Sequence, residues 1–118
     1  MLLHNGHLRP ADEGLLKADD GLAVCGRGAF ETLAAYRGVP FQAEAHFARL
    51  RRAAAVLGLR CPKDAALLSA AEEILVTNGL RDADLARVRI TLSSPADGSE
   101  SWWVEATPPP PHPPEAAV

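Results

Sequence analysis

AFETLAAYRGVPF, at residues 29–41, decides the fold, because it predicts a β-hairpin that leads directly into a helix. Residues 30–36 form a plausible strand, and Arg37-Gly38 supplies the turn. The return strand is predicted at residues 39–41, where Pro40 has no backbone N–H to donate to a neighbouring strand. We therefore expect that strand to be short or to lie at an edge of the sheet.

Two helices are predicted after this hairpin. The first spans residues 42–58, where apolar side chains recur every three or four residues and Gly58 is placed to end the helix. Its apolar positions are Phe47, Leu50, Ala54 and Leu57. The second helix runs from about residue 63 to residue 78, with Pro62 near its start and Gly79 just beyond its end.

Strands are predicted on both sides of this central part. Residues 1–9 contain Asn5-Gly6, the strongest two-residue hairpin signal. Residues 86–92 and 101–107 predict a further pair of strands, whereas residues 11–28 are predicted to be an irregular glycine-rich loop. The fold class is α+β, with two helices on one face of a small, mostly antiparallel sheet. Residues 1–107 are predicted to form the domain, and the proline-rich residues 108–118 an inter-domain connector or tail.

Composition limits the possible functions. The chain has 118 residues, a formal net charge of −3 and only two cysteines, so it predicts one domain with neither a disulfide framework nor a cysteine-rich zinc site. No metal site is predicted. The negative charge argues against a nucleic-acid partner. The sequence also has no apolar run long enough to span a membrane and no signal-peptide pattern, so we expect a cytoplasmic protein.

The residues themselves offer several candidate sites. His46 and Arg49 are three residues apart on the first predicted helix, so they share one flank and together can bind an anion. Each also has a simpler interpretation, as a packing histidine and a solvated arginine. Glu31 lies within a strand and must be paired if its face is buried. Cys25 lies in the glycine-rich loop with no histidine nearby, which indicates an unreactive thiol.

Motifs in the first half of the chain resemble the N-terminal domain of the class IV aminotransferases, the fold-type IV pyridoxal-phosphate enzymes. This group includes branched-chain aminotransferases, D-amino acid transaminases and 4-amino-4-deoxychorismate lyases. The motifs that carry the resemblance are GRGAFET at 26–32, YRGVPF at 36–41 and HFARL at 46–50. Leu92-Ser93-Ser94 follows Thr91, where D-amino acid transaminases often have Arg-Gly. The resemblance therefore favours the lyase or a general aminotransferase.

The resemblance also implies roles for particular residues. Arg49 matches the arginine that holds the phosphate of the pyridoxal-phosphate cofactor in this family. Phe30 matches a position that lines the substrate pocket, and Cys25 and Glu31 are its neighbours in that predicted pocket. The implied partners are a small-molecule amino substrate and a second copy of the chain in a homodimer.

One part of the family pattern has no counterpart in this sequence. The lysine that binds the cofactor covalently belongs to the family's C-terminal domain, and neither Lys17 nor Lys63 matches its position. We therefore expect the N-terminal portion of such an enzyme, inactive as an isolated chain. The alternative is a naturally short, non-catalytic module that uses the same domain for binding or dimerisation.

Overall fold

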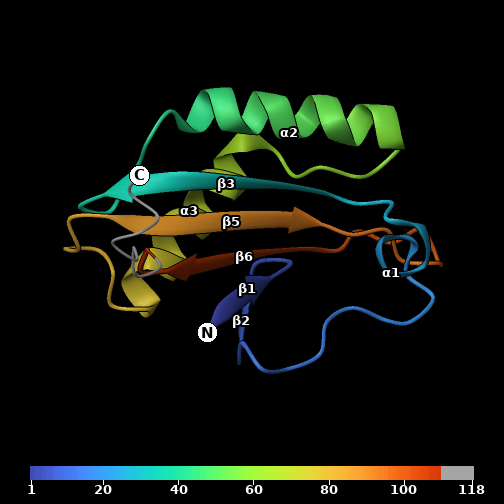
Figure 1. Cartoon of the computed structure of the whole chain (residues 1–118), viewed down its shortest axis with the longest axis horizontal. Coiled ribbons are helices and arrows are strands. Elements are labelled where there is room, and N and C mark those ends of the chain that lie inside the picture. The colour runs from blue at the N-terminus through green and yellow to red at the C-terminus, as the bar shows by residue number, and fades with distance from the viewer. Residues whose placement is uncertain (110–118) are drawn as a thin grey trace, which may run out of the picture.

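The computed structural model describes residues 1–109, which form a six-stranded antiparallel sheet with helices packed against it (Figure 1). The strands lie in the order β2-β1-β6-β5-β3-β4. Their bounds are β1 Leu2–His4, β2 His7–Arg9, β3 Ala29–Tyr36, β4 Val39–Pro40, β5 Ala86–Leu92 and β6 Trp102–Thr107. The predicted α+β fold and its antiparallel strand pairs are confirmed. The proline-rich connector predicted at 108–118 falls almost wholly on residues 110–118, which lie outside the described residues.

The two predicted long helices are present, α2 at Ala43–Leu57 and α3 at Asp64–Thr77. Gly58 follows α2 with a positive φ of 67°, and its backbone N–H donates to the carbonyls of the last turn. A residue without a Cβ adopts this left-handed conformation at little cost, so the helix ends there. The predicted edge position of the Pro40 strand is also confirmed, because β4 has two residues and is the last strand of the sheet.

The prediction that residues 11–28 are irregular throughout is wrong at Gly21–Cys25, which form the short helix α1. The carboxylate of Asp20 accepts a hydrogen bond from the Leu22 backbone N–H, so Asp20 caps the start of this helix. Gly26, with a φ of 70°, ends it one turn later. A single turn between two glycines has no apolar periodicity, so the pattern that revealed α2 and α3 could not reveal α1.

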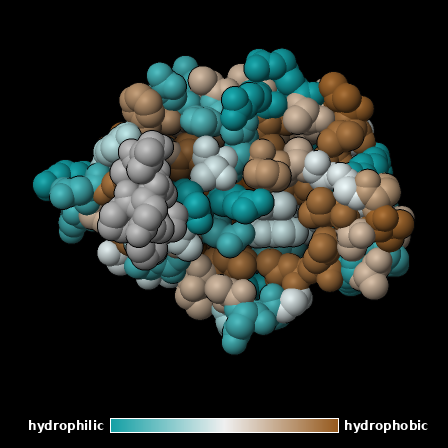
Figure 2. Space-filling model, viewed as in Figure 1, coloured by the Kyte–Doolittle hydropathy of each residue, from teal (hydrophilic) through white to brown (hydrophobic). Residues whose placement is uncertain are grey.

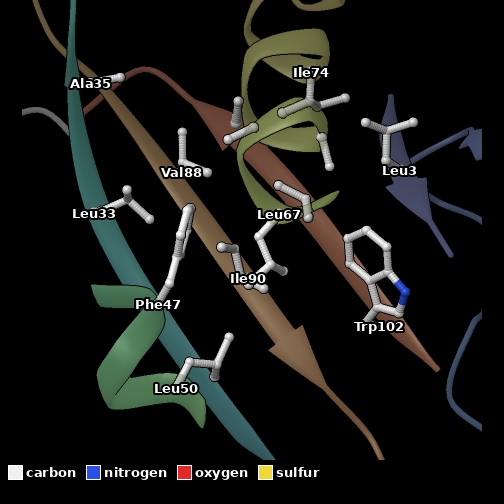
Figure 3. Close-up of a cluster of buried hydrophobic side chains, with 14 of the residues drawn as sticks. Leu3, Leu33, Ala35, Phe47, Leu50, Leu67, Ile74, Val88, Ile90 and Trp102 are labelled. Carbon is white, nitrogen blue, oxygen red and sulfur yellow. The ribbon is translucent and has the colours of Figure 1, made fainter. Parts of the chain in front are cut away.

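The hydrophobic core lies between the sheet and the helices α2 and α3 (Figure 3). Every second residue of β3 is buried, so one face of this strand meets the helices and the other does not. The helices contribute Phe47 and Leu50 from α2 and Leu67 and Ile74 from α3, and β5 contributes Val88 and Ile90. Trp102 packs into this core, whereas its neighbour Trp103 lies on the opposite face and is only partly buried.

The sheet face opposite α3 points toward the viewer in Figure 1. The strand residues that alternate with the buried ones lie on this face. Arg87 and Arg89 of β5 are exposed, and Phe30 and Tyr36 of β3 are exposed large hydrophobics. Figure 2 shows hydrophilic side chains across the middle of this view and hydrophobic side chains gathered toward the end at which Figure 1 places α1. We call the sheet face opposite α3 the open face.

Candidate functional site

A buried carboxylate joins β3 to α2 at the centre of the candidate site. Glu31 points from β3 toward α2, and its side chain is only 5% exposed. It accepts a bidentate pair of hydrogen bonds from Nε and Nη2 of Arg49 and a third, at 3.2 Å, from His46 Nδ1. His46 and Arg49 lie three residues apart on α2, so one helix flank presents both groups to one carboxylate. The prediction that a buried Glu31 must be paired is confirmed.

The electrostatics of this cluster follow from its geometry. Burial alone would raise the pKa of Glu31, but hydrogen bonds from Arg49 and His46 outweigh it and hold that pKa below its ordinary value. The bond to Glu31 likewise raises the pKa of Arg49 above its ordinary value. Both groups are therefore charged at neutral pH. The cluster fixes a cation in one orientation at the surface of α2.

Arg49 itself remains accessible to a ligand. Its side chain is 68% exposed, whereas that of its partner Glu31 is buried. Glu31 uses Nε and Nη2, and within residues 1–109 Nη1 makes no hydrogen bond. A guanidinium held on one side and open on the other can bind an oxyanion through the N–H groups of its open side.

Phe30 lies on the other face of the sheet. Consecutive strand residues point to opposite faces, so Phe30 faces away from the cluster that Glu31 forms with α2. The Phe30 ring is 60% exposed, and the guanidinium carbon of Arg89 lies 4.3 Å from its centroid. The sequence did not single out Arg89, although strand pairing of Thr32 with Arg89 places it beside Phe30. Phe30 and Glu31, two of the three residues predicted to line the substrate pocket, therefore face opposite sides of the sheet.

Cys25, the third of them, is an exposed residue at the end of α1. Its thiol donates to the Gly21 carbonyl at 3.3 Å, a contact that stays within α1. Because Cys25 belongs to α1, the position of this helix decides which surface Cys25 faces. Asp20 and Ser94 hold this helix in place, since the buried Asp20 carboxylate accepts from the Ser94 N–H at 2.8 Å and Gly21 N–H donates to the Ser94 carbonyl.

Arg27 makes hydrogen bonds that no local pattern in the sequence predicts. It donates to the Leu57 and Gly58 carbonyls at the end of α2 and, at 2.8 Å, to the Ser94 hydroxyl. These partners are 30 to 67 residues away along the chain, so no local pattern announces them. The flanking glycines, Gly26 and Gly28, were the only signal that this segment approaches other backbone closely.

The described part of the chain holds no group of three or more histidine, cysteine or acidic side chains arranged to bind a metal ion. Its helices are all too short or too polar to cross a membrane. Within residues 1–109, neither lysine makes a hydrogen bond or an ion pair with Glu31, His46 or Arg49. Lys17 lines a cavity of about 510 Å³ beside His4 and Asp97, and Lys63 is the residue that precedes α3.

Comparisons with known proteins agree with this geometry. The family described as amino-transferase class IV matches residues 28–118. A hypothetical aminotransferase from Mycobacterium tuberculosis, solved in a PLP-bound form, superposes with a TM-score of 0.81 and 28% identity over 93% of this chain and 40% of that one. A putative 4-amino-4-deoxychorismate lyase gives a TM-score of 0.64 and 36% identity, covering 92% of this chain and 40% of the other.

The branched-chain amino acid aminotransferase of Escherichia coli shares the fold, with a TM-score of 0.77 at 19% identity over 91% of this chain and 39% of that one. No curated protein matches the chain. The chain spans about 40% of the length of the solved structures it resembles. Because the family match covers most of its residues, the chain belongs to the class IV aminotransferases.

Proposed function

We propose that this domain holds the phosphate group of pyridoxal phosphate in an enzyme that acts on a small amino substrate. The observation that carries the proposal is the exposed guanidinium of Arg49, fixed by the buried Glu31. Among the matched structures, the Mycobacterium tuberculosis aminotransferase is described as PLP-bound. The cofactor, when bound, supplies the electron sink for reactions at the α-carbon of an amino compound.

The residues of this chain bind and orient the cofactor in this proposal. Arg49 presents Nη1 to a phosphate oxygen, while Glu31 prevents the guanidinium from rotating away. His46 donates to the same carboxylate and limits the charge that Glu31 directs at the phosphate. Phe30 faces away from this cluster, so in this proposal it contacts the amino substrate on the open face and not the phosphate.

A cofactor titration tests this role. Pyridoxal phosphate is added to the nitrogen-labelled chain, and the Nε–H resonance of Arg49 is followed by NMR. Saturable shifts at Arg49 and His46 are expected, and Arg49→Ala should abolish the response at His46. Arg52→Ala is the matched control, because Arg52 is an exposed arginine of the same helix. Equal binding by the Arg49→Ala and Arg52→Ala variants would overturn the proposal.

We also propose that the 118-residue chain alone does not catalyse transamination. Lys17 lines the cavity beside His4 and Asp97, and Lys63 precedes α3, so neither lysine belongs to the cluster of Glu31, His46 and Arg49 that would hold the cofactor phosphate. Amino transfer from branched-chain amino acids to 2-oxoglutarate is expected to stay at background. Activity that disappears in the Lys17→Arg or the Lys63→Arg variant would contradict this.

We propose that the partner of this chain is a second copy of itself, because several exposed hydrophobic side chains cluster at one end of the sheet. Tyr36, Val39 and Phe41 of the β3–β4 hairpin are each at least half exposed, and the Tyr36 and Phe41 rings meet edge to face. Sedimentation equilibrium is expected to show a dimer that Val39→Lys weakens. A monomer at every concentration, with or without that substitution, would remove this proposal. A stable dimer with no cofactor response at Arg49 would instead support the non-catalytic module.

A further inference from the structure

A small cavity at the end of α2 lies apart from the Arg49 cluster and has no role in the proposed cofactor site. Its volume is about 130 Å³. The residues that form it come from three separate segments: Arg27 from the turn before β3, residues 58–60 from the link between α2 and α3, and residues 93–95 and 98–99 from the loop between β5 and β6.

The charged side chains that line this cavity are both arginines. Arg27 and Arg60 both line it, and none of its lining residues carries a carboxylate. The carbonyls at the end of α2 would oppose an anion, because a helix C-terminus is a negative pole. Arg27 covers these carbonyls, since its Nε donates to Leu57 at 2.9 Å and its Nη2 to Gly58 at 3.3 Å. The remaining guanidinium N–H groups of Arg27 and the exposed Arg60 make the cavity favourable for negative charge.

Ser93 carries a buried hydroxyl beside the cavity. It lines the cavity and is only 5% exposed, and its Oγ is the buried side-chain polar atom that has no hydrogen-bond partner within residues 1–109. Buried hydroxyls are nearly always hydrogen-bonded, so a buried water molecule is the expected partner of the Ser93 Oγ, which lies behind the cavity wall. Its neighbour Ser94 already accepts from Arg27 at 2.8 Å and still has its own hydroxyl hydrogen to donate.

We propose that this cavity binds a small tetrahedral oxyanion of the phosphate or sulfate type. Arg27 and Arg60 supply charged N–H donors, and the Ser94 hydroxyl donates to a further oxygen. The backbone of this loop is already fixed, because the Ser94 N–H donates to Asp20 and its carbonyl accepts from Gly21. The ligand is either the free ion or the terminal phosphate of a larger ester. The volume admits the phosphate group itself and leaves any remaining part of an ester outside.

A phosphate titration of the nitrogen-labelled chain tests this site. Inorganic phosphate replaces sodium chloride at constant ionic strength, and the backbone amide resonances of Gly58, Ser93 and Ser99 are followed. Saturable shifts are expected. Arg60→Ala should weaken the affinity by about tenfold, the loss of one charge-assisted hydrogen bond. The exposed Arg60 can be replaced without removing the contacts that Arg27 makes to α2.

Control variants separate this site from the cofactor site. Arg52→Ala and Arg49→Ala should both leave the phosphate response at Ser93 unchanged, whereas Ser94→Ala should weaken it. Glycerol 3-phosphate forms the second arm, in which binding equal to that of phosphate identifies a terminal phosphate and no binding identifies the free ion. Shifts that never saturate, or that are equal in the wild type and in Arg60→Ala, would show the inference to be wrong. Loss of the response in Arg49→Ala would also refute it, while leaving the cofactor proposal intact.

Discussion

Replacement of Glu31 by glutamine tests whether the carboxylate organises the candidate site. Glu31 accepts three hydrogen bonds, two from Arg49 and one from His46. A glutamine side chain has a single acceptor oxygen, and its NH₂ group would face donors. A hydrogen bond to a charged group contributes a net ~1.5–3 kcal/mol, and solvent around the exposed Arg49 weakens its share. We therefore expect Glu31→Gln to lower the free energy of unfolding by about 2 kcal/mol near neutral pH.

The pH dependence of this loss identifies its cause. The folded-state pKa of Glu31 lies below the ordinary 4.5, so its stabilising contribution is fully present above that value and is lost as the pH falls through the folded-state pKa. Glutamine does not titrate. The stability difference between Glu31→Gln and the wild type should consequently be largest near neutral pH and shrink steadily below 4.5.

Urea unfolding followed by tryptophan fluorescence provides the measurement, because Trp102 lies in the core. With an m-value of about 2 kcal/mol/M, the loss corresponds to a midpoint shift of about 1 M. Glu73→Gln is the matched control, since Glu73 is exposed on α3, and it should change stability by less than about 0.5 kcal/mol. Equal effects of the Glu31 and Glu73 substitutions, or a difference that does not change with pH, would refute the reasoning.

Three further predictions concern the core, the loop and the thiols. Leu67→Ala should cost ~2–5 kcal/mol in urea unfolding, because Leu67 is fully buried between α3 and the sheet, and a loss below about 1 kcal/mol would contradict this packing. Asp20→Ala should cost ~1–2 kcal/mol and speed amide exchange at Leu22 and Ser94, and unchanged exchange at both amides would count against the cap. Cys25 should react with a maleimide faster than Cys61, because burial raises the pKa of Cys61, and mass spectrometry showing the reverse order would oppose it.

Local patterns in the sequence were enough to place most of the fold. The apolar spacing of Phe47, Leu50 and Ala54 predicted α2, and alternation predicted β5 at residues 86–92, which are its observed bounds. Pro40 and Gly58 marked the edge strand and the helix end, because both residues constrain the backbone by their own covalent structure. Such signals need no information about distant residues.

The site could be predicted only in part. Helical spacing placed His46 and Arg49 on one flank, and burial of Glu31 required a partner for it. Neither argument identified which partner, since Glu31 and Arg49 are 18 residues apart and meet only because β3 packs under α2. The short α1 was missed because a five-residue helix has no apolar periodicity, and because Asp20 is held by a hydrogen bond from Ser94, 74 residues away.

The sequence by itself determined the element types, the antiparallel class of the sheet and the family to which the chain belongs. Those properties follow from side-chain periodicity and from residues with special backbone geometry, all of which act over a few positions. Only the tertiary structure decided that Arg89 covers the Phe30 ring, that Arg49 is held by a buried carboxylate, and that Arg27 meets Ser94 beside a cationic cavity. These contacts join segments distant along the chain, so their charges and hydrogen bonds are set by packing rather than by local sequence.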